Sequence, residues 1–172
     1  MQRLEELWVD QNILQYITFP ASRNLRILKI GGNIDLEHAK IISKLPSSLF
    51  SNSLTKLDLS SSGIEDLPVQ IGQLVTLTQL DLSGNKLGPD FGDKISKLRR
   101  LEILNLKENK LKKLDADLSK LRNLTHFDIS ENEFREFDES VLTKMRRLHK
   151  LDCSNNQIEA MPTNFGELRP DK

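Results

Sequence analysis

The chain repeats one pattern of hydrophobic and polar positions seven times, L-x-x-L-x-L-x-x-N-x-L, at spacings of 21 to 29 residues. The pattern is clearest as LDLSGNKL at Leu80–Leu87 and LNLKENKL at Leu104–Leu111. A period of this length is typical of a supersecondary unit that stacks on copies of itself. The first leucines of units one to seven are Leu4, Leu25, Leu54, Leu77, Leu101, Leu124 and Leu148.

Each unit contains a short alternation of apolar and polar residues that predicts a strand with one buried face, as in Leu80–Leu82. Copies that repeat in one direction must pair in parallel, so the rest of each unit must cross back over the other face. Pairs of apolar residues three apart predict a short helix or 3₁₀ turn in that crossover. They are Ile71/Leu74, Ile95/Leu98, Leu118/Leu121, Leu142/Met145 and Phe165/Leu168.

An asparagine follows the strand in nearly every unit. An amide inside the arc can bond backbone groups of neighbouring turns, where an unpaired polar group would be costly. We therefore assign these asparagines a structural role. They are Asn12, Asn33, Asn85, Asn109, Asn132 and Asn156, and Ser62 takes this position in unit three.

This pattern resembles leucine-rich repeat proteins over nearly the whole chain. Leu67-Pro68 and Met161-Pro162 follow the asparagine position, which is similar to the intracellular 23-residue subclass that includes Ras-group scaffolds. The resemblance implies an α/β fold: a right-handed solenoid, or horseshoe, with a parallel sheet on its concave face and helical or 3₁₀ segments on its convex side. It also implies a binding role. The length of 172 residues predicts a single domain over residues 1–172.

Three departures from the repeat are expected to shape the molecule. Asp35–Leu45 has the spacing of a true helix that Pro46 stops. Gly88–Gly92 predicts a bulged outer loop. Neither end shows a polar cap, so we expect a longer protein, a missing cap, or self-association through the open ends.

Composition narrows the setting of the domain. The 25 basic and 25 acidic residues balance, which argues against a nucleic-acid binder. No apolar run reaches the length of about 18 residues that a membrane span needs. Because the only cysteine is Cys153, no internal disulfide can form, and we expect a cytoplasmic location. At a buried strand position, this thiol is expected to be a core side chain.

Strand residues that point away from the core should form rows across the concave face, about 4.8 Å apart from strand to strand. We expect a protein partner to bind these rows. The expected contact residues are Trp8, Ile27, Lys29, Lys56, Asp58, Asp81, Ile103, Asn105, Lys107, His126, Asp128, Lys150 and Asp152.

Trp8 departs from the repeat consensus, and tryptophan is the residue type that most often anchors an interface. It either contacts a partner together with the exposed apolar Ile27 and Ile103, or packs beneath an N-terminal cap. The aspartates are either an acidic stripe for a basic partner or the ordinary filling of a Leu-Asp-Leu-Ser repeat. Lysines in neighbouring rows, namely Lys56, Lys107 and Lys150, can neutralise them.

A second cluster, the basic rim, lies on units four to seven, in the residues just before each strand. It could hold an acidic partner or phosphate groups, or it is a solvated edge. The absence of interleaved aromatic residues argues against single-stranded nucleic acid. The basic rim consists of Lys97, Arg99, Arg100, Lys120, Arg122, Lys144, Arg146 and Arg147.

Enzymatic readings find little support. His126 could pair with Asp128, but no nucleophile stands beside them, and ligands on a flat strand face rarely converge on a metal. We therefore expect no catalytic, cofactor or metal site. The expected function is a cytoplasmic adaptor or scaffold in signalling, with a small GTPase or a phosphatase as the partner that the resemblance suggests. The alternatives are a recognition domain from a larger kinase, GTPase or ubiquitin ligase, and a fragment of an extracellular receptor.

Overall fold

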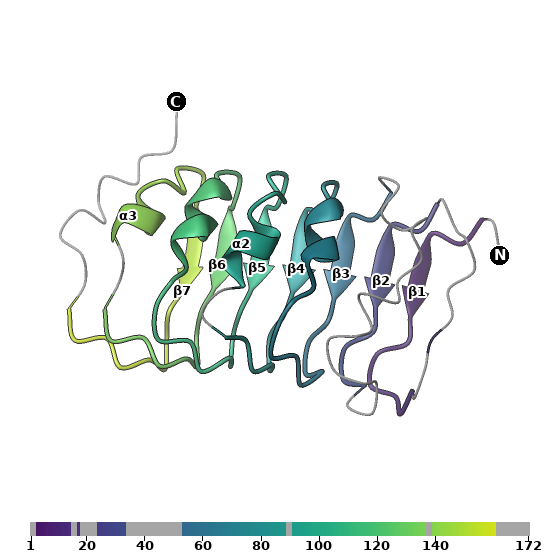
Figure 1. Ribbon diagram of the computed structural model, residues 1–172, viewed down its shortest axis with the longest axis horizontal. Coiled ribbons are helices and arrows are strands. Elements are labelled where there is room, and N and C mark those ends of the chain that lie inside the picture. Colours follow the sequence, from purple (N-terminus) through teal and green to yellow (C-terminus); the bar gives the residue numbers. More distant parts are fainter. Residues whose placement is uncertain are drawn as a thin grey trace.

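The fold is built on a single parallel sheet of seven short strands (Figure 1). The computed structural model describes residues 3–14, 17, 24–33, 53–88, 91–136 and 139–160. Each strand has three residues, because the alternating segment of each repeat is no longer than that. The strands are β1 Glu6–Trp8, β2 Ile27–Lys29, β3 Lys56–Asp58, β4 Gln79–Asp81, β5 Ile103–Asn105, β6 His126–Asp128 and β7 Lys150–Asp152.

The strands follow one another in chain order, and every neighbouring pair is parallel. The middle leucines pair directly, as Leu57 does with Leu80, so one leucine stacks on the next along the interior. The predicted rows are confirmed in register from end to end. One row is Glu6, Ile27, Lys56, Gln79, Ile103, His126 and Lys150, and the next is Trp8, Lys29, Asp58, Asp81, Asn105, Asp128 and Asp152.

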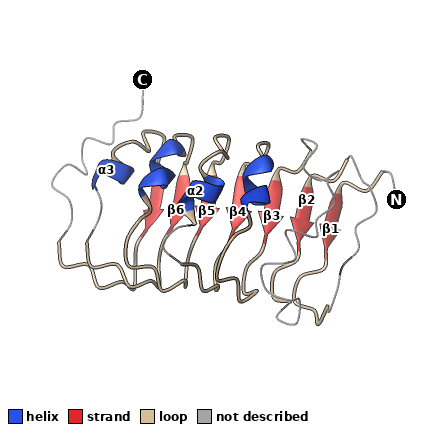
Figure 2. Ribbon diagram, viewed as in Figure 1, coloured by secondary structure: helices blue, strands red, loops and turns tan. Residues whose placement is uncertain are grey.

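Short helices cover the opposite side of the sheet, as the apolar pairs predicted (Figure 2). Within the described residues, each predicted pair is buried against the leucines of the strands. The pair of Phe165 and Leu168 lies outside the described residues. Among the described residues, the helical elements are the 3₁₀ helices η2 Val69–Gln73 and η3 Ala116–Lys120, and the helices α2 Gly92–Ile95 and α3 Glu139–Leu142.

Buried asparagine amides connect consecutive units. The Oδ1 atom of Asn132 accepts hydrogen bonds from the N–H groups of Asn109 and Leu111 at 3.1 and 2.9 Å. Its Nδ2 donates to the carbonyl oxygens of Leu106, Ile129 and Ser130 at 2.9 to 3.0 Å. One side chain thus satisfies five backbone groups from two units, which confirms the structural role expected for this residue.

The same bonding recurs along the interior of the solenoid. Asn33, Asn85 and Asn109 are also buried, and each donates to carbonyl oxygens of its own unit and of the preceding one. In unit three, the hydroxyl of the shorter Ser62 donates to the Ser60 carbonyl at 2.9 Å. Among the described residues, this hydroxyl bonds its own unit and does not span two units.

The residue just before each asparagine position has a left-handed backbone, with φ between 48° and 70°. This conformation turns the chain out of the strand and brings the next side chain inward. Glycine adopts it freely, whereas other residues incur about 1–2 kcal/mol. The residues concerned are Gln11, Gly32, Ser61, Gly84, Glu108, Glu131 and Asn155.

The outer units are less enclosed than the middle ones. Asn12 is exposed, and among the described residues its Nδ2 bonds only carbonyls of its own unit, those of Val9 and Asp10. Cys153 was expected to be a buried core residue, but it is only partly buried. This expectation was wrong because Cys153 lies in the last described unit, next to β7, which has one neighbouring strand in the sheet. Desolvation still raises the pKa of its thiol.

Two expected departures from the repeat lie wholly or partly outside the described residues. The predicted helix at 35–45 is one of them. The predicted bulge at 88–92 is described only at its ends, where α2 begins at Gly92. There the Gly92 N–H donates to Asp115 Oδ2 at 3.0 Å, and a Cβ at this position would come within 2.5 Å of the Asp115 carboxyl carbon. A side chain at this position would force Asp115 to shift away from its bond to the Gly92 N–H, so glycine suits this close approach.

We expect Asn132→Ala to lower the free energy of unfolding by about 3 kcal/mol, because it leaves several buried backbone groups without partners. Urea denaturation followed by circular dichroism measures the change. Asn12→Ala is the matched control at the same repeat position, and its loss should stay below about 1 kcal/mol because the site is exposed. Equal losses for the two variants would contradict the role assigned to the buried amide.

Candidate functional site

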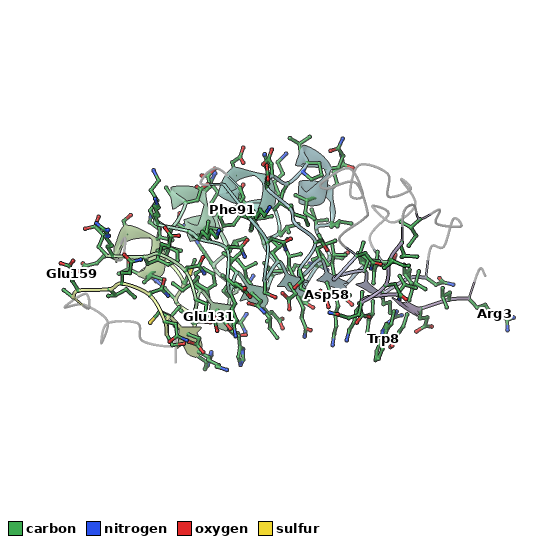
Figure 3. The ribbon with its side chains drawn as sticks, turned by 90° about the horizontal axis from the view of Figure 1, so that it is seen from below. Arg3, Trp8, Asp58, Phe91, Glu131 and Glu159 are labelled. Atoms are coloured by element: carbon green, nitrogen blue, oxygen red, sulfur yellow. The ribbon has the colours of Figure 1, made fainter. Side chains whose placement is uncertain are left out.

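The outward face of the sheet, here called the strand face, carries the rows predicted to meet a partner. Figure 3 shows Trp8, Asp58 and Glu131 on this side of the molecule, with Phe91 toward the helices. Trp8 on β1 is 61% exposed, although it is one of the largest apolar side chains in the protein. The Lys29 Nζ atom on β2 lies 4.3 Å from the centroid of the Trp8 ring, a cation–π contact across the two strands. The tryptophan is therefore exposed but held in place.

Two other apolar residues on this face are less accessible than predicted. Ile27 and Ile103 were expected to be exposed, but both side chains are half-buried. Each lies on a strand flanked on both sides, so Glu6 and Lys56 shield Ile27 while Gln79 and His126 shield Ile103. Trp8 differs because β1 has one neighbouring strand, β2, in the sheet. The exposed apolar surface that a partner could contact on the strand face therefore lies mainly at the β1 end.

The aspartates of the strand face are half-buried, and each is engaged at the end of its own strand. The Oδ1 atom of Asp81 accepts from the N–H and the hydroxyl of Ser83, at 2.9 and 2.6 Å. The same pair of bonds joins Asp58 to Ser60, Asp128 to Ser130 and Asp152 to Ser154. Of the two readings left open by the sequence, this geometry favours the structural one, since each carboxylate caps its strand.

The bonds to serine lower the pKa of one of these carboxylates, that of Asp152. The pKa of Asp152 lies below its ordinary value of 3.8, first because the Ser154 hydroxyl donates to it and then because the Ser154 N–H does. The positive charge of Lys150 makes a smaller contribution in the same direction. Since the folded pKa is lowered, these bonds stabilise the fold above the ordinary pKa, and that contribution is lost as the pH falls through the folded value.

The lysines around the aspartates were expected to neutralise them, but the structure pairs one of them elsewhere. Lys107 Nζ lies 3.0 Å from Glu131 Oε1, and this carboxylate raises the pKa of Lys107 by hydrogen bond and charge. Asp128 contributes less to that pKa. Lys56 and Lys150 are exposed, and neither forms an ion pair with any described residue. Positively and negatively charged side chains therefore both occur on the strand face.

His126 makes no pair with Asp128. Its exposed ring places Nδ1 3.0 Å from the Thr125 hydroxyl, while the Asp128 carboxylate is bonded to Ser130. In the described part of the chain, no three histidine, cysteine or acidic side chains come together as metal ligands. The row of strand residues is too flat to bring such groups to one point.

The basic rim occupies the edge of the sheet from which the strands start. All eight of its side chains are exposed. Lys120 pairs with Asp117 at 2.6 Å, and the other seven form no ion pair with any residue that the structure describes. A hollow opens in this rim between units six and seven, beside Arg122, Arg146 and Arg147.

A larger hollow at the opposite edge was not anticipated from the sequence. It lies beyond the ends of the strands, and its lining includes Lys112, Glu133 and Arg135. Lys112 Nζ is 3.8 Å from Glu133 Oε2, and Arg135 Nε donates to Gln157 Oε1 at 3.4 Å. Glu133, Glu136 and Glu159 line this hollow together with four cationic side chains, so its charges balance in part, whereas the hollow in the basic rim has no acidic lining residue.

The comparisons with known proteins agree with this architecture. Two family models, both described as leucine rich repeat, match residues 99–158 and residues 50–67 and 73–90. None of the curated proteins compared with the chain matches its sequence. The described residues include no helix with the length and apolar character needed to traverse a lipid bilayer.

Several solved structures share the fold. A leucine-rich repeat protein of Leptospira interrogans superposes with a TM-score of 0.77 at 26% identity, over 99% of this chain and 48% of that one. Internalin C2 of Listeria monocytogenes gives 0.68 at 25% identity, over 86% and 59%. A chain of the Drosophila Toll–Spätzle complex gives 0.65 at 20% identity, over 81% and 19%. The protein thus spans about half the length of the first of these relatives.

The parallel sheet and the rows of outward strand residues define a solenoid of the horseshoe class. With the matching family models, they identify the chain as a leucine-rich repeat protein.

We expect Ser154→Ala to raise the pKa of Asp152 toward 3.8, because the largest cause of its lowering is the Ser154 hydroxyl. Carbon-detected NMR titration of the side-chain carboxyl measures this shift. Lys150→Gln is the control, and it should raise the same pKa less because its charge acts through solvent. A larger shift in Lys150→Gln than in Ser154→Ala would show that charge, not the strand cap, sets this pKa.

Proposed function

We infer that this chain is a non-catalytic adaptor that binds a protein partner on its strand face. Leucine-rich repeats indicate a protein-interaction module, and such solenoids present their strands as an extended binding surface. Trp8, exposed at the β1 end of that surface, is the observation that supports this choice of face. A cytoplasmic signalling role, with a small GTPase or a phosphatase as partner, belongs to the same proposal.

Trp8 has the properties of an interface anchor. It exposes a large apolar surface, and truncation of a buried interface tryptophan typically costs more than about 2 kcal/mol of binding energy. The contact with Lys29 restrains the ring before binding, so less side-chain entropy is lost in the complex. Burial beneath a partner would also strengthen the cation–π contact by removing water from it.

The rest of the strand face supplies specificity. The carboxylates of Asp58 and Asp81 are fixed by their serine bonds, so a partner meets acceptors whose positions are set in advance. Asn105 Nδ2 donates to Asp81 Oδ2 at 3.1 Å and links this row across two strands. Lys56 and Lys150 extend from exposed positions in the adjacent row. A partner with complementary mixed charge would fit this pattern and exclude others.

The cytoplasmic setting rests on the thiol inventory. With Cys153 as its only cysteine, the chain can form no internal disulfide, and proteins of oxidising compartments commonly rely on such bonds. Its fold is typically a non-catalytic interaction scaffold, which suits an adaptor.

We expect Trp8→Ala to weaken partner binding at least about tenfold, since the variant removes the exposed anchor. The immobilised chain would capture proteins from a cell lysate for quantitative mass spectrometry, and calorimetry would then give the dissociation constant for the captured partner.

Val69→Ala is the matched control, because Val69 is 71% exposed on η2, on the side of the molecule opposite the strand face. It should leave the dissociation constant within about twofold, as expected for a surface residue outside an interface. Loss of binding in Val69→Ala with none in Trp8→Ala would place the partner on the helical side and refute the proposal.

A further inference from the structure

The basic rim contains a ladder of arginines that the strand register creates. Sheet pairing aligns Ile103 with His126 and His126 with Lys150. Arg99, Arg122 and Arg146 each precede those residues by four positions and therefore hold equivalent places in units five, six and seven. In unit four, the same position is Val75, so the ladder begins at unit five.

Charge concentrates at one point of the ladder, in the hollow between units six and seven. The hollow is lined by Arg122, Asn123, Thr143, Lys144, Arg146 and Arg147. Four of these six side chains are cationic and none is acidic. Because the four form no ion pair with any described side chain, their positive potential remains available to a ligand.

Asn123 organises one wall of this hollow. Its Oδ1 accepts a hydrogen bond from Arg147 Nη1 at 3.0 Å, and its Nδ2 donates to the Arg99 carbonyl at 2.6 Å. The amide thus connects units five, six and seven and holds the Arg147 guanidinium toward unit six. A guanidinium carries five N–H donors, so this bond leaves donors for an anion.

We propose that this hollow binds the phosphate group of a phosphorylated segment of a protein partner. A phosphorylated side chain carries about −1.5 to −2 charges and three strong acceptor oxygens, which suits several cations around one small hollow. Guanidinium forks match phosphate oxygens in pairs, and the restrained Arg147 loses less freedom on binding than a mobile arginine would. A single carboxylate would leave most of this charge unmatched.

The neighbouring rim extends the site along a bound peptide. Arg99 lies beyond Arg122 on the ladder, about 7 Å from the middle of the hollow if units are spaced like strands. An extended peptide covers that distance in about two residues. An acidic residue about two positions from the phosphorylated one would therefore meet Arg99 and Arg100.

The surroundings favour a peptide over a nucleic acid or a membrane. No aromatic side chain lines the hollow for stacking against bases. The ladder spans three units, about 10 Å, which is short for the several phosphate contacts that duplex binding uses. The large apolar side chains exposed in the described residues, Trp8, Ile13, Val69 and Val75, do not line this hollow, so nothing there would enter a lipid surface.

The test uses a fluorescent peptide with a central phosphothreonine and glutamates two positions to either side, measured by fluorescence anisotropy with the full chain. Its unphosphorylated form, inorganic phosphate, a DNA duplex and phosphatidylserine vesicles are the comparison probes. We expect the phosphopeptide to bind at least about tenfold more tightly than the unphosphorylated form, and binding to weaken as salt is raised. Inorganic phosphate should compete, but more weakly than the peptide.

The variant Arg122→Gln/Arg146→Gln should weaken phosphopeptide binding at least about tenfold, because two cations leave the hollow. Lys86→Gln/Lys113→Gln is the matched control, since it removes the same charge from exposed residues at the opposite edge. The dissociation constant of this control variant for the phosphopeptide should change less than about twofold, as expected for charges outside the site. Circular dichroism must show equal folding of both variants.

Four results would overturn the proposal. They are failure of the phosphopeptide to bind, equal binding of the two peptide forms, equal losses in both double variants, and tighter variant-sensitive binding of DNA, vesicles or free phosphate. The proposal does not rest on the strand-face partner, because Trp8→Ala should leave phosphopeptide binding unchanged.

Discussion

The buried asparagine amide is the interaction on which the rest of this solenoid depends. Each unit ends its strand with a turn that leaves backbone N–H and carbonyl groups inside the protein, where water cannot reach them. Asn85 and Asn132 satisfy those groups in two consecutive units at once. A left-handed residue just before the amide brings it inward, and the strain of that residue is offset by the bonds that follow.

This constraint fixes the surfaces as well as the core. Because the turns hold every strand in one register, outward side chains fall into rows, and loop residues stack at the edges in the same order. Trp8 beside Lys29 and Arg122 beside Arg146 are consequences of that order. The two surfaces lie on different parts of the scaffold, so one chain could hold two segments of a single partner and gain affinity from both. The opposite edge differs in charge, because acidic and basic side chains both line its hollow.

Much of the fold could be predicted from the sequence because leucines at fixed offsets leave few alternatives. The strands, their parallel order, the helical anchors such as Leu118 and the buried asparagines all follow from periodicity. The left-handed turns were not predicted, since only Gly32 and Gly84 mark them with glycine. The partial burial of Ile27 and Cys153 was also missed, because it depends on which neighbours stand beside each residue.

The roles of Asp81 and Ser83 could have been found from their recurring two-residue spacing, which places a hydroxyl next to each carboxylate. The hollow at Arg147 could not have been predicted from the sequence, because it depends on the contact of Arg147 with Asn123 between units.

Site-specific photo-crosslinking can show whether a partner lies against the strand face. A photoreactive benzoylphenylalanine would replace Lys56, which is exposed in the strand-face row beside Ile27 and Gln79. A second protein would carry the same group at Val69 on the helical side. We expect the partner to crosslink at position 56 and not at position 69. Crosslinking at position 69 alone would contradict it.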